Sequence, residues 1–369
     1  MSERPRSAPA HHFRTRLLRW FEANRRDLPW RRSRDAWGIW VSEVMLQQTR
    51  VEAVRTAYER FMARFPTPAS FATATDDDLL TAWRGLGYYR RARLLRDGAR
   101  QVVARHGGRV PDRSDDLEEL PGVGLYTRGA LASIAFGRAE IAVDGNVERV
   151  TARHRGIRAE TDSAEAQQAI RGAVSQWIDR RRPGDFNQAM MELGALVCTP
   201  TTPACERCPV AWDCKALACG LVHELPRRRR PRATVRVTAR VVLVVGNRGA
   251  LGGRVAEGQP NAGQIELPGA GMLTNQDAKT LADVLGARFG AHIDVGAVVA
   301  SVRHTITHHR IELHAHAASV KRRGRLSWFP IDDRTPWTTP SRKIFRQALR
   351  RRQAERVTRA EHLLSLPSL

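Results

Sequence analysis

Residues 117–137, LEELPGVGLYTRGALASIAFG, are typical of two helices joined by a turn that is rich in glycine. Gly122 and Gly124 let the backbone turn tightly and approach a bound molecule closely. The N–H groups of the turn and the positive end of the second helix suit a phosphate group. We therefore predict a helical hairpin that binds phosphate at these two glycines, with its second helix ending near Gly137. A plain corner between two helices is the alternative.

The composition of the chain favours a polyanionic partner. Its 369 residues include 61 Lys and Arg against 38 Asp and Glu, a formal net charge of +23. A surplus of this size usually indicates nucleic acid. No apolar run approaches the ~20 residues that a membrane span needs, and the N-terminal region lacks the apolar segment of a secretory signal. We expect a cytoplasmic, nucleoid-associated protein that is monomeric and does not contact membranes.

Helical periodicity dominates residues 12–218, and the apolar spacing over residues 37–65 predicts a helical run that ends at Pro66. The segment HELPRRRRPRAT then indicates a basic linker over residues 221–234. Its arginines are either a solvated spacer or a contact to DNA backbone. The β-branched run VRVTARVVLVV, residues 235–245, predicts a strand that opens an α+β domain.

Four of the five cysteines lie in one short segment with the spacing C-x6-C-x2-C-x5-C. In a reducing compartment, clustered thiols favour metal ligation over disulfides. Structural zinc usually shows two close cysteine pairs, whereas this segment has one close pair with long flanks. A loop that wraps a larger object suits a [4Fe–4S] cluster. We therefore predict a [4Fe–4S] cluster, with zinc as the alternative, on Cys198, Cys205, Cys208 and Cys214.

Asp144, in IAVDGNVERV, stands just ahead of an expected helix, where an N-cap role is its simplest explanation. The helical hairpin, the aspartate about twenty residues later and the four-cysteine loop together resemble the helix-hairpin-helix DNA glycosylase superfamily. The resemblance implies that Asp144 faces the sugar of an extruded nucleotide and stabilises positive charge at C1′. It also implies that the cysteine loop presents cationic side chains to a phosphate backbone.

The positions of the lysines indicate whether the protein only hydrolyses the glycosidic bond or also cuts the DNA strand. Bifunctional members of this superfamily attack C1′ with a lysine of the hairpin motif and then cut the strand. Tyr126 occupies that position here, and no lysine precedes Lys215. We therefore expect a monofunctional hydrolase.

Glu43 is the candidate general acid. It lies in WVSEVMLQQT among apolar residues, and burial there would raise the pKa of its carboxyl group. The alternative is a glutamate on the solvated side of an amphipathic helix. The segments WVSEVMLQQT, GLGYYRRARLL, LPGVGLYTRGA, AVDGNVERV and FNQAMMELGALVC together resemble the MutY-type adenine DNA glycosylases.

That resemblance implies a role for each site residue. Glu43 would protonate adenine at N7, Asp144 would stabilise the sugar cation, and Tyr126 and Asn146 would position the sugar and the water. The resemblance also implies four residues that bind substrate. Gln48 would lie beside the flipped base, and Tyr88 would wedge into the base stack. Arg31 and Glu192 would lie near the purine pocket.

The family also carries a second domain, related to Nudix hydrolases, that recognises 8-oxoguanine. The segment NAGQIELPGAGM is similar to its G-x-W-E-F-P-G strand, and SVRHTITHHRIEL is similar to its recognition loop. Thr307 and His308 would meet the damaged base there, while Ile306 replaces an aromatic residue. The segment NQDAKTLADVLGARFG lacks the R-E-x-x-E-E pattern that holds Mg²⁺, so we expect no nucleotide hydrolysis.

The expected fold is mainly α: a helix-hairpin-helix DNA glycosylase with a [4Fe–4S] loop, plus a C-terminal α+β Nudix-like domain. The predicted function is hydrolysis of adenine from mispairs with 8-oxoguanine or guanine in double-stranded DNA, during base excision repair. The alternatives are a thymine or pyrimidine mismatch glycosylase and a catalytically silent DNA-damage binder. The expected divisions are a glycosylase region 1–220 (a six-helix part about 33–138 and an iron–sulfur part from about 1–32 and 139–220), the linker 221–234, the recognition domain 235–355 and a tail 356–369.

Overall fold

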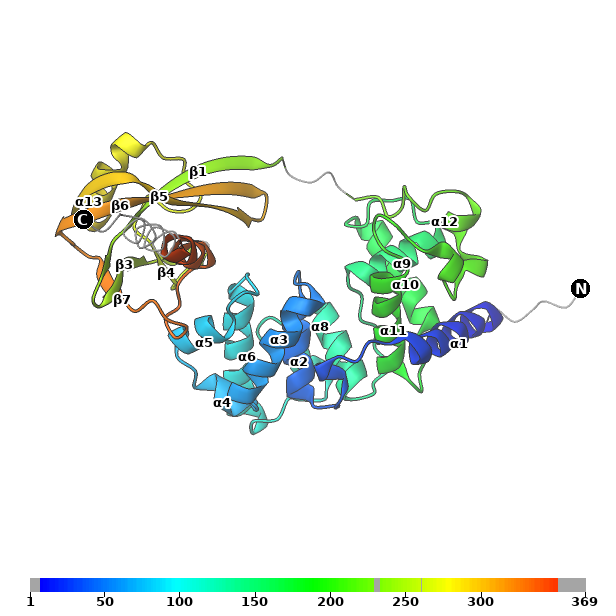
Figure 1. Ribbon diagram of the computed structural model, residues 1–369. Helices are drawn as coiled ribbons and strands as arrows, with labels where there is room; N and C mark the ends of the chain where they lie inside the picture. Colours follow the sequence, from blue (N-terminus) through cyan, green and yellow to red (C-terminus); the bar gives the residue numbers. More distant parts are fainter. Residues whose placement is uncertain (1–6, 229–232, 260, 351–369) are drawn as a thin grey trace, which may run out of the picture. The chain divides into compact units, whose positions relative to one another are not determined.

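The computed structural model describes residues 7–228, 233–259 and 261–350 (Figure 1). The chain divides into two compact units. The first comprises residues 1–74 and 90–230, and the second comprises residues 75–89 and 231–369. Two parts of the predicted organisation, residues 229–232 of the linker and the tail 356–369, lie outside the described residues.

The first unit is helical. Its described helices are α1 (Ser7–Asn24), α2 (Ala36–Leu46), α3 (Val51–Arg64), α4 (Pro68–Ala72), α6 (Arg90–His106), α7 (Ser114–Glu118), α8 (Leu125–Ala130), α9 (Gly145–Arg155), α10 (Ala164–Trp177), α11 (Pro183–Leu196) and α12 (Lys215–Ala218). None of the helices within the described ranges is long and apolar enough to cross a membrane.

Helix α1 packs with three helices from much later in the sequence. Phe13, Leu17 and Phe21 of α1 are buried in one cluster with apolar side chains of α9, α10 and α11. The stacked rings of Phe13 and Trp177 have centroids 4.1 Å apart. This core holds the start of α9, where Asp144 lies, in a defined place.

The predicted continuous helical run over residues 37–65 is wrong in one respect, because it is broken into α2 and α3. The chain leaves the helix at Gln47, and Gln48 takes a left-handed conformation with φ +57°. The guanidinium of Arg91, from α6, donates hydrogen bonds to the carbonyls of Val44 and Gln47, 2.6 and 2.5 Å away. Apolar positions continue in phase across the break, so periodicity alone could not reveal it.

The glycine-rich segment forms the expected helical hairpin from α7 and α8. Gly122 has φ +79°, a conformation that favours glycine, and Gly124 precedes the first residue of α8. The segment that precedes Asp144 packs directly against α8 at Gly129. Any side chain there would place its Cβ only 2.0 Å from the carbonyl oxygen of Ile141, so this close packing requires glycine. A π-helical turn continues α8 through Ala135, and the helix ends beside Gly137 as predicted.

The second unit contains two small β-sheets with the helices α5 (Asp76–Ala82) and α13 (Leu281–Phe289). In one sheet, β1 runs parallel to β6, and β6 pairs with β5 in an antiparallel hairpin. In the other, β3 pairs with β2, β4 and β7. The mixed sheets and helix confirm an α+β domain after residue 235. Its strands are β1 (Val235–Leu243), β2 (Val245–Gly246), β3 (Gly249–Arg254), β4 (Ile265–Glu266), β5 (His292–Ile306), β6 (His309–Arg322) and β7 (Ser327–Phe329).

Candidate active site

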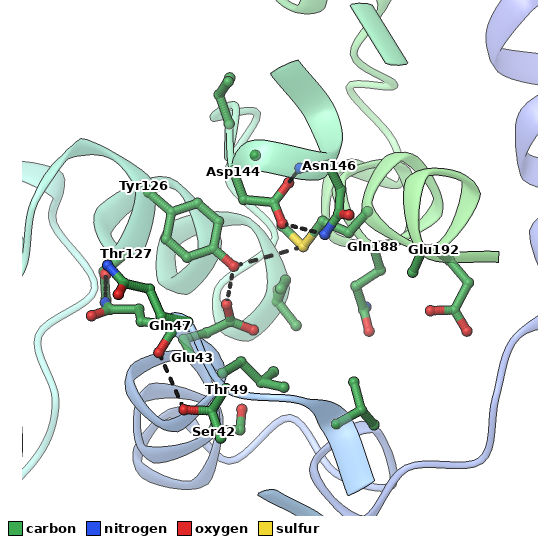
Figure 2. Close-up of a pocket in the computed structure, with 18 of the residues that line it drawn as sticks. Ser42, Glu43, Gln47, Thr49, Tyr126, Thr127, Asp144, Asn146, Gln188 and Glu192 are labelled. Carbon is green, nitrogen blue, oxygen red and sulfur yellow. Dashed lines mark hydrogen bonds between the residues drawn. The ribbon is translucent and has the colours of Figure 1, made fainter. Parts of the chain in front are cut away.

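A pocket of about 830 Å³ opens within the first unit, between α2, α8, the start of α9 and α11 (Figure 2). Its volume lies in the range of small-molecule sites in proteins. The pocket brings together nine of the residues predicted to act at the site: Arg31, Glu43, Gln48, Gly122, Gly124, Tyr126, Asp144, Asn146 and Glu192.

Glu43 lies on α2 and is only 5% exposed, so the alternative of a solvated glutamate is excluded. Burial raises the pKa of its carboxyl group to about 7, and the nearby charge of Asp144 acts in the same direction. A hydrogen bond from Tyr126 and the charge of Arg31 oppose this rise in pKa. A carboxyl group with such a pKa can carry a proton near neutrality, which suits a general acid.

Tyr126, on α8, donates a hydrogen bond from its hydroxyl to the Glu43 carboxyl group (Figure 2). Burial and the two nearby carboxyl groups hold the pKa of Tyr126 well above its usual value. The hydroxyl therefore stays protonated and serves as a donor. It also lies 3.7 Å from Sδ of Met191, on α11, which closes this side of the pocket.

Asp144 caps α9 and faces the pocket at the same time. Its Oδ1 accepts hydrogen bonds from the backbone N–H groups of Asn146 and Val147, at 3.0 and 2.8 Å. Its Oδ2 accepts a bond of 2.8 Å from the side-chain amide of Asn146 (Figure 2). The N-cap role predicted for Asp144 is thus confirmed, and the cap presents its second oxygen beside Asn146 in the pocket.

Arg149 links the start of α9 to the cysteine loop, and the sequence analysis missed it. Its guanidinium donates to Oδ1 of Asn146 and to the carbonyl of Gly194, both at 2.8 Å. Its Nε donates to the carbonyl of Cys198 at 2.7 Å. The spacing of Asn146 and Arg149, three residues apart on one helix, is a signal that could have suggested their contact.

Arg31 and Glu192 meet as a pair, and a second arginine joins them. Arg31 donates two hydrogen bonds of 3.0 and 2.9 Å to the two carboxyl oxygens of Glu192. Arg26, which the sequence analysis missed, donates two more of 2.9 and 2.7 Å. Burial alone would raise the pKa of Glu192, but the two guanidinium groups lower it to about 2. The Glu192 carboxyl group is therefore ionised, and four charge-assisted hydrogen bonds from the two arginines hold it in place on this side of the pocket.

The turn between α2 and α3 forms part of the pocket lining. Gln48 lies on it, and Gln47 donates a bond of 3.4 Å to the hydroxyl of Thr127 on α8. Arg228, in the predicted linker, also lines this pocket. The linker thus contributes a cation to the pocket, close enough to Arg149 for the two charges to interact, which composition alone could not place.

The four predicted cluster ligands surround one small cavity at the far end of α9. Cys198, Cys205, Cys208 and Cys214 line it together and form no disulfide. Arg153 donates a 3.3 Å hydrogen bond to Sγ of Cys198. Within the described ranges, no three His, Cys, Asp or Glu side chains are arranged to hold a single metal ion. Four soft sulfur donors around one cavity, with a cation beside them, fit a cluster larger than one ion.

Three predicted substrate-binding residues belong to the second unit. Tyr88 is 48% exposed and has φ +46°, directly after the glycine turn of residues 85–87. Thr307 and His308 form the two-residue turn between β5 and β6, where Thr307 has φ +52°. The hydroxyl of Thr307 lies 3.3 Å from Nδ1 of His308. Both turns present polar or aromatic side chains on strained backbone, which is common at binding sites.

The helical unit is similar in sequence to a known family of DNA repair proteins. Residues 41–176 match the model of the HhH-GPD superfamily of base excision DNA repair proteins. The chain is 41% identical over 207 residues to an adenine DNA glycosylase of Mycobacterium tuberculosis, which covers 56% of this chain and 68% of that protein. It is 50% identical over 213 residues to the adenine DNA glycosylase of Homo sapiens, which covers 55% of this chain and 39% of that protein.

Among solved structures, a thermostable thymine-DNA glycosylase superposes with a TM-score of 0.52 at 28% identity. The match covers 57% of this chain and 97% of the other. A trapped endonuclease III–DNA covalent intermediate superposes with a TM-score of 0.51 at 23% identity, which supports the fold alone. The chain spans about two fifths of the length of the human relative, so that similarity concerns part of that protein rather than all of it.

Proposed function

This chain belongs to the adenine DNA glycosylase family, and on that premise we propose that it hydrolyses the N-glycosidic bond of adenine mispaired with 8-oxoguanine or guanine. The observation that carries the proposal is the shared pocket of Glu43 and Asp144, in which burial raises the pKa of Glu43 to about 7. A buried acid can protonate a purine as it leaves, and a second carboxyl group in the same pocket can face the positive charge that forms on the sugar.

The proposed reaction begins when adenine leaves the base stack and enters the pocket. Glu43 gives its proton to N7, so the electrons of the C1′–N9 bond can pass to the purine and adenine leaves neutral. Asp144 stabilises the positive charge that develops at the sugar. Water, positioned by Asn146, adds to C1′ and gives its proton to the Glu43 carboxylate, which returns to its protonated form. Tyr126 holds the Glu43 carboxyl group in place for the first step.

Hydrolysis rather than lyase chemistry is proposed because the required amine is missing from the site. Schiff-base formation needs a nucleophilic lysine within reach of C1′. Residues 1–214 contain no lysine, and the described lining of the pocket includes none. The protein is therefore proposed to be monofunctional and to leave an intact strand with an abasic site.

The four cysteines are proposed to hold a [4Fe–4S] cluster, which would fasten the loop that they share. Hydrogen bonds from Arg149 and Arg153 would then keep the cysteine loop in a fixed relation to α9. Gly122 and Gly124 are proposed to bind a DNA phosphate at the hairpin turn. The region 1–220 is proposed to form the glycosylase domain.

The second unit is proposed to contain a Nudix-like recognition domain over residues 235–355. Thr307, exposed on the turn between β5 and β6, and the half-buried His308 beside it would contact 8-oxoguanine. Tyr88 would wedge into the base stack, as aromatic side chains do in proteins that kink DNA. Double-stranded DNA is the proposed partner, and its negative charge suits the net charge of +23.

A thymine mismatch glycosylase is the second candidate function, favoured by the similarity to a thermostable thymine-DNA glycosylase at 28% identity. Single-turnover assays distinguish the two on duplexes carrying A opposite 8-oxoguanine, A opposite G, and T opposite G. The proposal expects release of adenine from the first two and strand cleavage only after alkali or heat. Release of thymine without release of adenine would overturn it, and strand cleavage without alkali would overturn the monofunctional assignment.

A further inference from the structure

His154 is a buried polar side chain on α9 that the proposed reaction does not use. It is 3% exposed, and its ring packs edge-on against Phe13 and Trp177, with centroids 4.9 and 5.0 Å away. Neither ring nitrogen has a hydrogen-bond partner among the residues that the structure describes. Buried polar groups without partners are costly and uncommon, so this pair of nitrogens calls for an explanation.

The residues around His154 indicate which hydrogen-bond acceptor its ring could reach. The side chain lines the same cavity as Cys198, Cys205, Cys208 and Cys214. The preceding residue, Arg153, donates to Sγ of Cys198 at 3.3 Å, and its carbonyl oxygen lies 3.7 Å from Sγ of Cys214. His154 therefore lines the cavity around which the four cysteines lie.

Three backbone carbonyls beyond the helix accept hydrogen bonds from Arg153, and none of them bonds to His154. The Arg153 guanidinium donates to the carbonyls of Thr199, Pro200 and Leu225, at 2.7, 3.1 and 2.7 Å. The aromatic neighbours of His154 contribute packing surface to the ring rather than a conventional acceptor. Because no described group bonds either ring nitrogen and the ring lines the cysteine cavity, we take the occupant of that cavity as the acceptor for an imidazole N–H.

We propose that His154 is a positioning residue for the cluster, donating a ring N–H to one of the sulfurs that the four cysteines gather. The inference rests on the proposed [4Fe–4S] cluster and is independent of base excision. An imidazole carries at least one N–H in either protonation state, so the donor is always present. Hydrogen bonds to sulfur stabilise the more reduced cluster and raise its reduction potential.

The competing explanation is packing, in which the ring merely fills space between Phe13 and Trp177. Two substitutions in the full-length protein separate the explanations. His154→Phe keeps an aromatic ring and removes both nitrogens. His154→Gln loses the ring but keeps an N–H donor.

The measurements are iron content, absorbance near 400 nm and the cluster midpoint potential by protein-film voltammetry. We expect the potential of His154→Phe to shift to more negative values and its iron to be lost faster in ferricyanide. His154→Gln should recover most of the wild-type potential. If His154→Phe takes up no cluster while His154→Gln does, the requirement for a donor is supported. Wild-type potentials in both variants, or a shift in His154→Gln equal to that in His154→Phe, would overturn the proposal.

A measurement on the unsubstituted protein covers the case in which neither variant takes up iron. After labelling with ¹⁵N-histidine, electron–nuclear spectroscopy of the paramagnetic cluster should detect coupling to a ring nitrogen. A spectrum without such coupling would overturn the assignment of His154. Protein that excises adenine but contains no iron would remove the cluster and this inference, and would leave the proposed excision intact.

Discussion

The hydroxyl of Tyr126 donates to the carboxyl group of Glu43 from a position 83 residues later in the sequence. Both side chains line the pocket that also contains Asp144. Burial raises the pKa of Glu43 to about 7, while this hydrogen bond pulls it back down. Burial is the largest influence on this pKa, and the contact with Tyr126 limits how far it rises.

Replacing Glu43 with glutamine tests the acid directly. Glutamine has nearly the same shape but no transferable proton, so we expect single-turnover excision of adenine to fall roughly 10²–10⁴-fold, the usual contribution of a general acid. The matched control is Glu59→Gln, on the exposed face of α3, which should keep the wild-type rate. A Glu43→Gln rate equal to that of the control would contradict the assignment.

The pH dependence of excision should report the pKa of Glu43. Its protonated form is the active one, so the rate should decline as pH rises through about 7. Tyr126→Phe removes a hydrogen bond that lowers this pKa, and we expect the alkaline limb of the profile to move to higher pH even as the maximal rate falls. An unmoved or lower alkaline limb, measured in single turnovers from pH 5 to 9, would argue against the coupling.

Asp144→Asn separates helix capping from catalysis. Asparagine caps helices about as well as aspartate, so the free energy of unfolding should change by less than about 1 kcal/mol. Loss of the carboxylate should slow excision roughly 10²–10³-fold, as expected when a charge facing a developing cation is removed. The control is Ser163→Ala, which removes the N-cap of α10 and should cost about 1 kcal/mol without slowing excision. Equal activity of Asp144→Asn and wild type would leave only the cap role.

Glu192 should make the helical unit sensitive to acid. Its folded pKa of about 2 lies below the ordinary value of 4.5, so its stabilising contribution is full above pH 4.5 and is lost as pH falls towards 2. That contribution is at most about 3 kcal/mol. Urea unfolding between pH 3 and 7 should show this loss.

The substitution Glu192→Gln should abolish that part of the acid dependence. It should also lower the free energy of unfolding at pH 7 by about 3 kcal/mol, because two guanidinium groups lose their partner. Asp27→Asn, at an exposed pair with Arg32, should leave the free energy of unfolding almost unchanged, because exposed ion pairs contribute little. A Glu192→Gln protein as stable as Asp27→Asn would contradict the buried pairing.

Local rules were sufficient for several features of this protein. The glycine turn of the hairpin, the end of its second helix near Gly137 and the capping of α9 by Asp144 depend on residues within a few positions of one another. The β-branched run predicted β1. Such features follow from backbone preferences and side-chain periodicity, which depend only on residues close together in the sequence. The apolar neighbours of Glu43 on α2 left burial and a solvated position both open, and the resemblance to a known family favoured the burial that the structure shows.

Tertiary structure decided the rest, because the groups concerned come from distant segments. Arg91 of α6 holds the turn that breaks the predicted helix after Leu46, and Arg26 joins Glu192 from 166 residues away. Arg149 ties Asn146 to the cysteine loop. The proton affinity of Glu43 likewise depends on the burial and charges that folding assembles around it. Sequence by itself identified which side chains could do chemistry, whereas only packing decided their partners and protonation, since electrostatic interactions act through space and not along the chain.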